Sequence, residues 1–266
     1  MSEAMSLALR IFVIAIVLWG ALALIARKFT FFPEQAIASE LPAGAEEVTI
    51  QTLDGEQLRG WWFNAPGAPL ATLYLHGNGG YLSVYSEHLL AIRQAGNSLL
   101  IIDYRGYGQS TGSPSEQGLY TDAQAGYQWL RQKGYPGERI ILQGLSLGTA
   151  VAVEIASRNK IGGMVLEAPL SSARAVAAGI LPIIGWTLPL GFDSIAKIPR
   201  LQAPLLVIHG DRDRVINLSL GRDLFAAAPE PKEFLVVPGA GHEDLPMVAG
   251  LKYQAALQRL YQRCRQ

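Results

Sequence analysis

A serine flanked by glycines stands where a predicted strand meets a predicted helix. The segment Gly144–Gly148 has the pattern G-x-S-x-G; the strand Arg139–Gly144 leads into it and the helix Leu147–Arg158 follows. In such a sharp turn the serine Oγ is exposed at the sheet edge, and the glycines let neighbouring backbone approach closely. A glycine-rich turn with an incidental serine is the simpler alternative, but the flanking strand and helix favour Ser146 as a nucleophile.

A nucleophilic serine needs a general base, and the sequence offers four histidines. His88 lies within a predicted helix, which favours a surface or packing role. His76 and His209 end predicted strands in His-Gly pairs, which favours shaping of the loops that follow. His242 follows the last predicted strand, from which a base can reach a serine at the same sheet edge. We therefore predict that His242 is the base.

The carboxylate that orients this base is expected in the loop after the strand Pro204–Gly210. Asp211 and Asp213 both lie there, and residues two positions apart share a face of an extended loop. Their spacing therefore does not choose between them.

The loop His76–Gly80 is a candidate for one half of an oxyanion hole. It follows the strand Ala71–His76, and its glycines allow backbone N–H groups to converge on a developing negative charge. An anion nest or a simple tight turn is the alternative, and it is disfavoured if Ser146 is the nucleophile. The other donor is expected at Leu147, whose N–H belongs to a helix N-terminus.

Strands and helices alternate from residue 48 onward, which predicts one doubly wound, mostly parallel sheet. Continuously apolar central strands indicate helices on both faces, and the turn signal at Leu53–Glu56 predicts an antiparallel hairpin at the start. The predicted strands are Val48–Thr52, Leu58–Asn64, Ala71–His76, Ser98–Tyr104, Arg139–Gly144, Gly163–Ala168, Pro204–Gly210 and Glu233–Pro238. The predicted helices are Ser83–Ala95, Leu119–Lys133, Leu147–Arg158, Leu218–Ala228 and Leu245–Arg263.

An uncharged apolar run, Ile11–Ala26, precedes this domain. It spans about 24 Å as a helix, and Arg10 can snorkel so that the preceding turn helps to cross the ~30 Å hydrocarbon core. A cleaved signal peptide and a buried core helix are the alternatives. We expect a single-pass anchor over residues 7–28, a connector over 29–47 and a catalytic domain over 48–266. Charges flank the run on both sides and leave its orientation open.

Composition excludes several classes of function. Lys plus Arg and Asp plus Glu are both 22, so the chain has no basic surplus for nucleic-acid binding. Half of the residues are hydrophobic and 17% are charged, which excludes a disordered chain and suggests membrane contact. The single cysteine, Cys264, excludes an internal disulfide and a cysteine-based zinc site.

Taken together, the chain resembles the α/β-hydrolase superfamily, whose nucleophile, acid and base follow in the chain order Ser, Asp, His. Within it, the chain is similar to the small membrane-anchored branch that includes bud-emergence-type hydrolases and ABHD-type depalmitoylases. The motifs that carry the resemblance are Leu58–Trp62, His76–Gly79, Asp103–Ser110, Gly144–Gly148, Pro204–Gly210 and Gly239–His242.

The resemblance implies an α/β-hydrolase fold with an eight-stranded sheet and a short cap, preceded by one N-terminal transmembrane helix. In that family the acid stands three residues after the His-Gly pair, which implies Asp213, followed by Val215. The oxyanion donors map onto the backbone of Asn78 and Leu147.

These inferences predict a membrane-anchored serine hydrolase that cleaves carboxylic esters or thioesters of small molecules or acylated proteins. Ser146 attacks the carbonyl, His242 moves the proton and Asp213 holds the imidazolium. No metal or organic cofactor is implied. A serine peptidase or amidase is one alternative, and a catalytically silent, membrane-tethered interaction protein is another.

Two further segments have open interpretations. Arg105–Gly112 contains G-x-G-x-x-x-G, near a dinucleotide pattern, but Pro114 stands where a phosphate-binding helix should begin. A structural loop with Asp103 or Arg105 in a buried pair is favoured. The uncharged segment Ala175–Phe192, in the cap position, either covers the core or forms a short cap over an acyl pocket.

Overall fold

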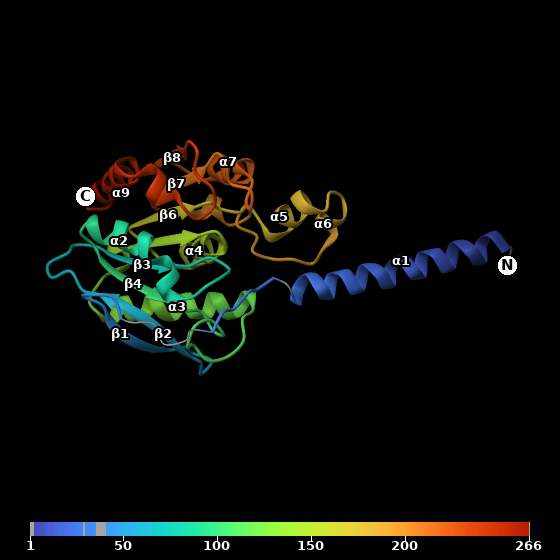
Figure 1. Ribbon diagram of the computed structural model, residues 1–266, viewed down its shortest axis with the longest axis horizontal. Helices are drawn as coiled ribbons and strands as arrows, with labels where there is room; N and C mark the ends of the chain where they lie inside the picture. The colour runs from blue at the N-terminus through green and yellow to red at the C-terminus, as the bar shows by residue number, and fades with distance from the viewer. Residues whose placement is uncertain (1–2, 29, 36–40, 266) are drawn as a thin grey trace.

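Eight strands form one sheet in the order β1-β2-β4-β3-β5-β6-β7-β8 (Figure 1). The computed structural model describes residues 3–28, 30–35 and 41–265. Strands β1 and β2 are antiparallel, β2 is antiparallel to β4, and the other neighbours are parallel. The predicted eight-stranded, mostly parallel sheet and its initial hairpin are confirmed. The strands are β1 (Glu46–Gln51), β2 (Gln57–Phe63), β3 (Ala71–Leu75), β4 (Ser98–Ile102), β5 (Ile140–Leu145), β6 (Gly163–Glu167), β7 (Leu205–Gly210) and β8 (Lys232–Val237).

Helices cover both faces of the sheet, which explains the continuously apolar central strands. In β4, Leu99 and Ile101 pack with α2 and α9, whereas Leu100 and Ile102 pack with α3 and α4 on the other face. All four side chains are fully buried, and each such burial stabilises the fold by roughly 1.5–3 kcal/mol. The helices of the domain are η1 (Leu82–Tyr85), α2 (Ser86–Gln94), α3 (Glu116–Gln132), η2 (Gly137–Arg139), α4 (Leu147–Arg158), α5 (Ala173–Ile180), α6 (Ile184–Thr187), η3 (Ile198–Arg200), α7 (Leu218–Ala227), α8 (Leu245–Ala249) and α9 (Leu251–Cys264).

The long C-terminal helix predicted over Leu245–Arg263 is two helices in the structure. Gly250 separates α8 from α9 and has φ 50, a left-handed conformation that interrupts a helix and that glycine adopts readily. The prediction of one continuous helix there was wrong.

Helix α1 (Glu3–Lys28) projects from the domain, as Figure 1 shows. Its stretch Met5–Ala26 is long and apolar enough to cross a membrane. Of the side chains described between Met5 and Ala26, only Ala23 is buried, so the alternative of a buried core helix is wrong. Phe29 and residues 36–40 of the predicted connector lie outside the described residues.

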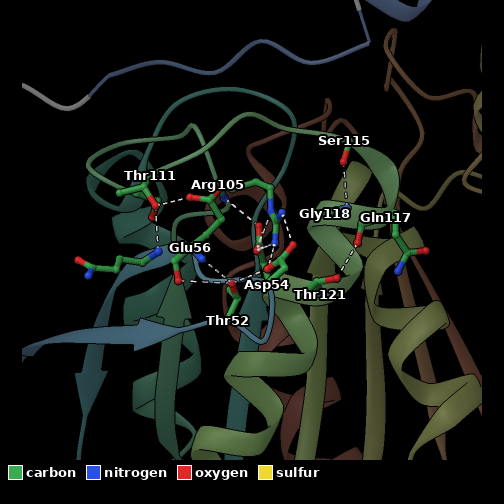
Figure 2. Close-up of polar contacts among 12 residues, drawn as sticks. Thr52, Asp54, Glu56, Arg105, Thr111, Ser115, Gln117, Gly118 and Thr121 are labelled. Atoms are coloured by element: carbon green, nitrogen blue, oxygen red, sulfur yellow. Dashed lines mark hydrogen bonds and ion pairs between the residues drawn. The ribbon is translucent and has the colours of Figure 1, made fainter.

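The loop after β4 is built around a buried arginine (Figure 2). Arg105 Nε donates to Asp122 Oδ1 at 2.9 Å, and Nη1 donates to Asp54 Oδ2 at 2.7 Å. The hydrogen bond from Arg105 lowers the pKa of Asp54 to about 2. The predicted buried pair is therefore confirmed for Arg105. Helix α3 begins only at Glu116, with Ser115 as its N-cap, so no helix starts at the glycines to hold a dinucleotide.

Candidate active site

Ser146 occupies a strained turn between β5 and α4. Its backbone has φ 52 and ψ −117, a conformation that residues other than glycine rarely adopt. Two hydrogen bonds hold the turn: Ser146 N–H donates to Glu167 O at 2.9 Å, and Thr149 N–H donates to Ser146 O at 3.0 Å. The fold thus holds this serine at the carboxyl edge of the sheet in a conformation that costs on the order of 1–3 kcal/mol.

The glycines on either side of Ser146 are required by close backbone contacts. A Cβ atom on Gly148 would lie 2.0 Å from Leu75 O at the end of β3, and one on Gly144 would lie 2.4 Å from Gly148 O. Contacts this short leave no space for a side chain, and the obstacle in both cases is backbone. The G-x-S-x-G spacing therefore reflects how tightly this turn packs onto the sheet.

The structure brings His242 and Asp213 together from two loops. His242 Nδ1 lies 2.8 Å from Asp213 Oδ2, and the other carboxylate oxygen accepts hydrogen bonds from the N–H groups of Val215 and Ile216, each at 2.8 Å. The carboxylate is therefore fixed in orientation. It favours the tautomer that carries its proton on Nδ1, in which Nε2 is the acceptor. Because Ser146 and His242 follow β5 and β8, they lie at the same sheet edge.

Asp213 carries a negative charge at physiological pH. Burial alone would raise the pKa of Asp213, but hydrogen bonds from His209 and His242 outweigh it and hold the pKa well below its usual range. His209 Nε2 lies 3.4 Å from Asp213 Oδ2 and 3.0 Å from Ile216 O. The loop that His209 was expected to shape is thus the one that carries the carboxylate.

The second aspartate of this loop has a different role. Asp211 Oδ1 accepts a hydrogen bond from Gly239 N–H at 2.7 Å, and its side chain is exposed. Asp211 therefore ties its own loop to the loop that carries His242. Of the two aspartates, only Asp213 contacts the imidazole among the described residues.

Ser146, Asn78 and Leu147 line one pocket. A Cβ atom on Gly77 would lie 3.7 Å from Ser146 Cβ, so the loop His76–Gly80 runs beside the serine. Within the described part of the chain, the backbone N–H groups of Asn78 and Leu147 donate no hydrogen bond. Both can donate to a negatively charged oxygen placed beside Ser146.

The side chain of Asn78 is fixed by three residues from two distant segments of the chain. Its Nδ2 donates to Thr30 O at 2.7 Å, and its Oδ1 accepts from Tyr107 Oη at 2.9 Å and from Phe32 N–H at 3.3 Å. The segment that follows α1 thus helps to position the loop His76–Gly80. No local pattern signals this, because Thr30 and Asn78 are far apart in the chain.

The pocket at Ser146 has a volume of about 450 Å³ and is mostly apolar. Cap residues form one wall, and the end of α1 forms another through Leu22, Ile25 and Ala26. The sequence indicates the cap as one possible wall of an acyl pocket, but it does not indicate this contribution of α1. The cap residues that line the pocket are Val176, Ala177, Ile180, Leu181, Leu188, Leu190 and Phe192.

The other histidines are packed within the domain. His76 is fully buried, which lowers its pKa to about 4, and its Nδ1 lies 2.8 Å from Gly77 O. Close to it, burial raises the pKa of Asp103 to about 7, although Leu82 N–H donates a hydrogen bond to this carboxyl. His88 is buried with its Nε2 3.3 Å from Glu167 Oε2. Among residues 3–28, 30–35 and 41–265, no group of three or more His, Cys, Asp or Glu side chains is placed to hold a metal ion.

The chain is similar in sequence to several known proteins. The family model described as Serine aminopeptidase, S33 (Hydrolase_4) matches residues 69–195, which include Ser146. An uncharacterized protein of Mycobacterium tuberculosis is 39% identical over 246 residues, covering 88% of this chain and 86% of that protein. Human alpha/beta hydrolase domain-containing protein 17C is 38% identical over 188 residues, covering 70% of this chain but only 56% of that protein.

A solved structure shares the fold. The Pyrococcus furiosus esterase Pf2001 superimposes with a TM-score of 0.74 at 21% identity, covering 88% of this chain and 100% of that one. At this identity the likeness concerns the fold, and it confirms the sheet architecture that the sequence predicted.

Proposed function

Because this chain belongs to the α/β-hydrolase superfamily, we propose that it is a membrane-anchored serine hydrolase that cleaves carboxylic esters or thioesters through an acyl-enzyme. The observation that carries the proposal is the strained Ser146 in an apolar pocket, at the same sheet edge as the His242–Asp213 hydrogen bond of 2.8 Å. Strain of this kind persists only where the surrounding structure holds the residue in place, and strained residues cluster at active sites.

In the proposed mechanism Ser146 Oγ attacks the carbonyl carbon while His242 Nε2 takes its proton. Asp213 stabilises the imidazolium, and the N–H groups of Asn78 and Leu147 stabilise the tetrahedral oxyanion. His242 then returns the proton to the departing alcohol or thiol, and the acyl group remains on Ser146. Water hydrolyses this acyl-enzyme, with His242 acting again as base.

The pocket favours an acyl chain over a peptide. An aminopeptidase has to bind the charged amino terminus of its substrate, which needs a carboxylate near the scissile bond. The described residues that line the pocket at Ser146 include no charged side chain. An apolar wall instead suits a hydrocarbon chain, which gains roughly 0.8 kcal/mol for each CH₂ removed from water.

The proposed organisation is an anchor over residues 7–28, a connector over 29–47 and a catalytic domain over 48–266. The apolar stretch of α1 and its exposed side chains support the anchor, although a signal sequence has the same length and composition. A hydrolase tethered in this way acts on substrates at a membrane surface.

Labelling by a fluorophosphonate probe tests the proposed function. The wild-type protein should label at Ser146, and Ser146→Ala should not; absence of labelling in the wild type would favour the silent interaction protein. A series of p-nitrophenyl esters from acetyl to octanoyl then tests the pocket, with kcat/KM rising several-fold for every two carbons until the pocket is full. A flat or falling series contradicts an acyl pocket, and faster cleavage of aminoacyl-p-nitroanilides favours the peptidase.

A further inference from the structure

The cap carries an exposed apolar rim, which we define as Ile180, Ile183, Ile184 and Trp186. Ile180 is 75% exposed, Ile183 is 83% and Trp186 is 60%. No charged residue occurs between Ala175 and Phe192. Exposed apolar surface that a soluble domain does not bury marks a site of contact with another apolar body.

The membrane helix lies against this part of the cap. Trp19 Nε1 of α1 donates a hydrogen bond to Thr187 Oγ1 of α6 at 2.9 Å. Ala23 is buried, and Leu22 and Ile25 line the pocket at Ser146. Figure 1 shows α5 and α6 at the end of the domain from which α1 projects. The apolar rim and the proposed membrane span are therefore continuous.

This contact sets the depth of the cap in a bilayer. The apolar stretch Met5–Ala26 has 22 residues and is about 33 Å long, close to the ~30 Å hydrocarbon core. Trp19 lies about 10 Å along the helix from Ala26, so a span centred in the core places Thr187 below the membrane surface. If the surface lay at Trp19 instead, the stretch from Met5 would be only about 22 Å long, too short to cross the core.

The hydroxyl of Thr187 is compatible with this depth. Thr187 Oγ1 both accepts from Trp19 and donates to Ile184 O at 2.8 Å, so its hydroxyl needs no water. The first charges on either side of the cap are Arg174 and Asp193, which lie 3.7 Å apart as an ion pair at its base. With Thr187 at that depth, the ion pair lies at the boundary between the hydrocarbon core and the headgroups.

We propose that the apolar rim is inserted into the lipid leaflet that α1 crosses, and that the pocket at Ser146 takes up acyl chains directly from the bilayer. The surface partner is the acyl region of a membrane, and the substrate class is esters or thioesters whose acyl chain is already embedded in lipid. The proposal rests on the proposed function for its substrate and on the span of α1 for its geometry.

Depth-dependent quenching tests the insertion without using catalysis. The full chain carrying Cys264→Ala and Ile183→Cys, labelled with the thiol probe NBD, is reconstituted in phosphatidylcholine vesicles with or without doxyl-labelled lipid. We expect blue-shifted NBD emission that loses at least about half its intensity to the doxyl lipid. Gln132→Cys is the matched control, because Gln132 is exposed at the opposite edge of the sheet and its probe should be unaffected. Equal, water-like emission from both positions would overturn the proposal.

A paired activity measurement tests the route of the substrate. The double variant Ile183→Asp, Trp186→Asp should lose about tenfold or more of its hydrolysis of an acyl ester embedded in vesicles, because charges are expelled from lipid. Its hydrolysis of soluble p-nitrophenyl acetate should be unchanged, since neither residue lines the pocket. The control is Leu90→Asp, on the exposed side of α2, which should leave both activities unchanged.

Equal loss of both activities in the double variant, with wild-type thermal unfolding, contradicts lateral uptake. If that variant does not fold, the quenching of the Ile183→Cys probe decides. Failure of the proposed function gives a different result, because the wild type then neither labels with fluorophosphonate nor cleaves p-nitrophenyl acetate, whatever the depth of the probe.

Discussion

Replacing Asp213 by asparagine should stop hydrolysis without unfolding the domain. Asp213 Oδ2 lies 2.8 Å from His242 Nδ1, while Oδ1 accepts from the N–H groups of Val215 and Ile216. Asparagine keeps one oxygen for these two N–H groups, so its NH₂ faces His242. The imidazole then has to accept at Nδ1, which moves its proton to Nε2. That is the atom which, in the proposed mechanism, must take the proton of Ser146.

The size of the effect follows from the tautomer. Holding a catalytic histidine in the wrong tautomer lowers kcat by about 10⁴, which corresponds to about 5.4 kcal/mol of activation free energy. The fold loses much less, because the two backbone hydrogen bonds, each contributing about 0.5–1.5 kcal/mol, are kept. We therefore expect an inactive protein with a cooperative thermal unfolding transition.

The matched control is Asp211→Asn. Asp211 accepts one hydrogen bond from Gly239 N–H, which the amide oxygen of asparagine can also accept, and its side chain is exposed. Its kcat/KM should stay within about twofold of the wild type. The assay is kcat/KM for p-nitrophenyl butyrate together with the rate of fluorophosphonate labelling. If Asp211→Asn is the more damaging change, or if Asp213→Asn keeps wild-type turnover, the assignment of the acid is wrong.

Three further predictions follow from the same geometry. Ser146→Ala should lower turnover on the order of 10³-fold or more while thermal unfolding stays close to the wild type, since the hydrogen bonds of the turn use only its backbone. Deleting residues 1–28 should leave a soluble, folded domain, because only Ala23 of Met5–Ala26 is buried. The shortened protein should keep its hydrolysis of acetyl esters. It should lose its selectivity for octanoyl esters, because the deletion removes the wall that α1 adds to the pocket. Asp103→Asn tests the raised pKa of about 7: the stability from a protonated Asp103 is full below about pH 4 and lost as the pH rises to 7. Asparagine does not titrate. The free energy of unfolding of the variant, measured in urea, should therefore rise relative to that of the wild type by about 1.4 kcal/mol per pH unit in this window. A difference that stays constant with pH would contradict the raised pKa of Asp103.

Most of the fold could be predicted because its signals are local. An apolar run such as Leu99–Ile102 is typical of a strand covered by helices on both faces, and Leu53–Glu56 has the residues of a tight turn. The break at Gly250 could not be predicted in the same way. A helical pattern tolerates one glycine, and whether the glycine turns left-handed depends on where the following helix packs.

The candidate site could be predicted element by element, because each of its side chains follows a strand at one edge of a parallel sheet. The choice between Asp211 and Asp213 could not be made from spacing. Only the resemblance to the α/β-hydrolase superfamily implies Asp213. In the structure the choice depends on a loop conformation in which the N–H groups of Val215 and Ile216 hold its carboxylate. The wall that α1 adds to the pocket could not be predicted from the sequence either, because Leu22 and Ser146 come together only in the folded chain.

If the pocket opens into lipid, its selectivity for acyl-chain length depends on whether the substrate comes from water or from the bilayer. An ester dissolved in water gains about 0.8 kcal/mol for each CH₂ that enters the pocket. The apolar wall around Leu181 and Ile25 therefore favours longer acyl chains. An acyl chain that enters from the bilayer moves from one apolar environment to another. It therefore gains almost no free energy from the removal of apolar surface from water. Its selection must come from packing against the cap and α1 within about 450 Å³, where an overlong chain is penalised by its shape. A steep profile with soluble esters and a shallow profile in vesicles are therefore two consequences of one pocket.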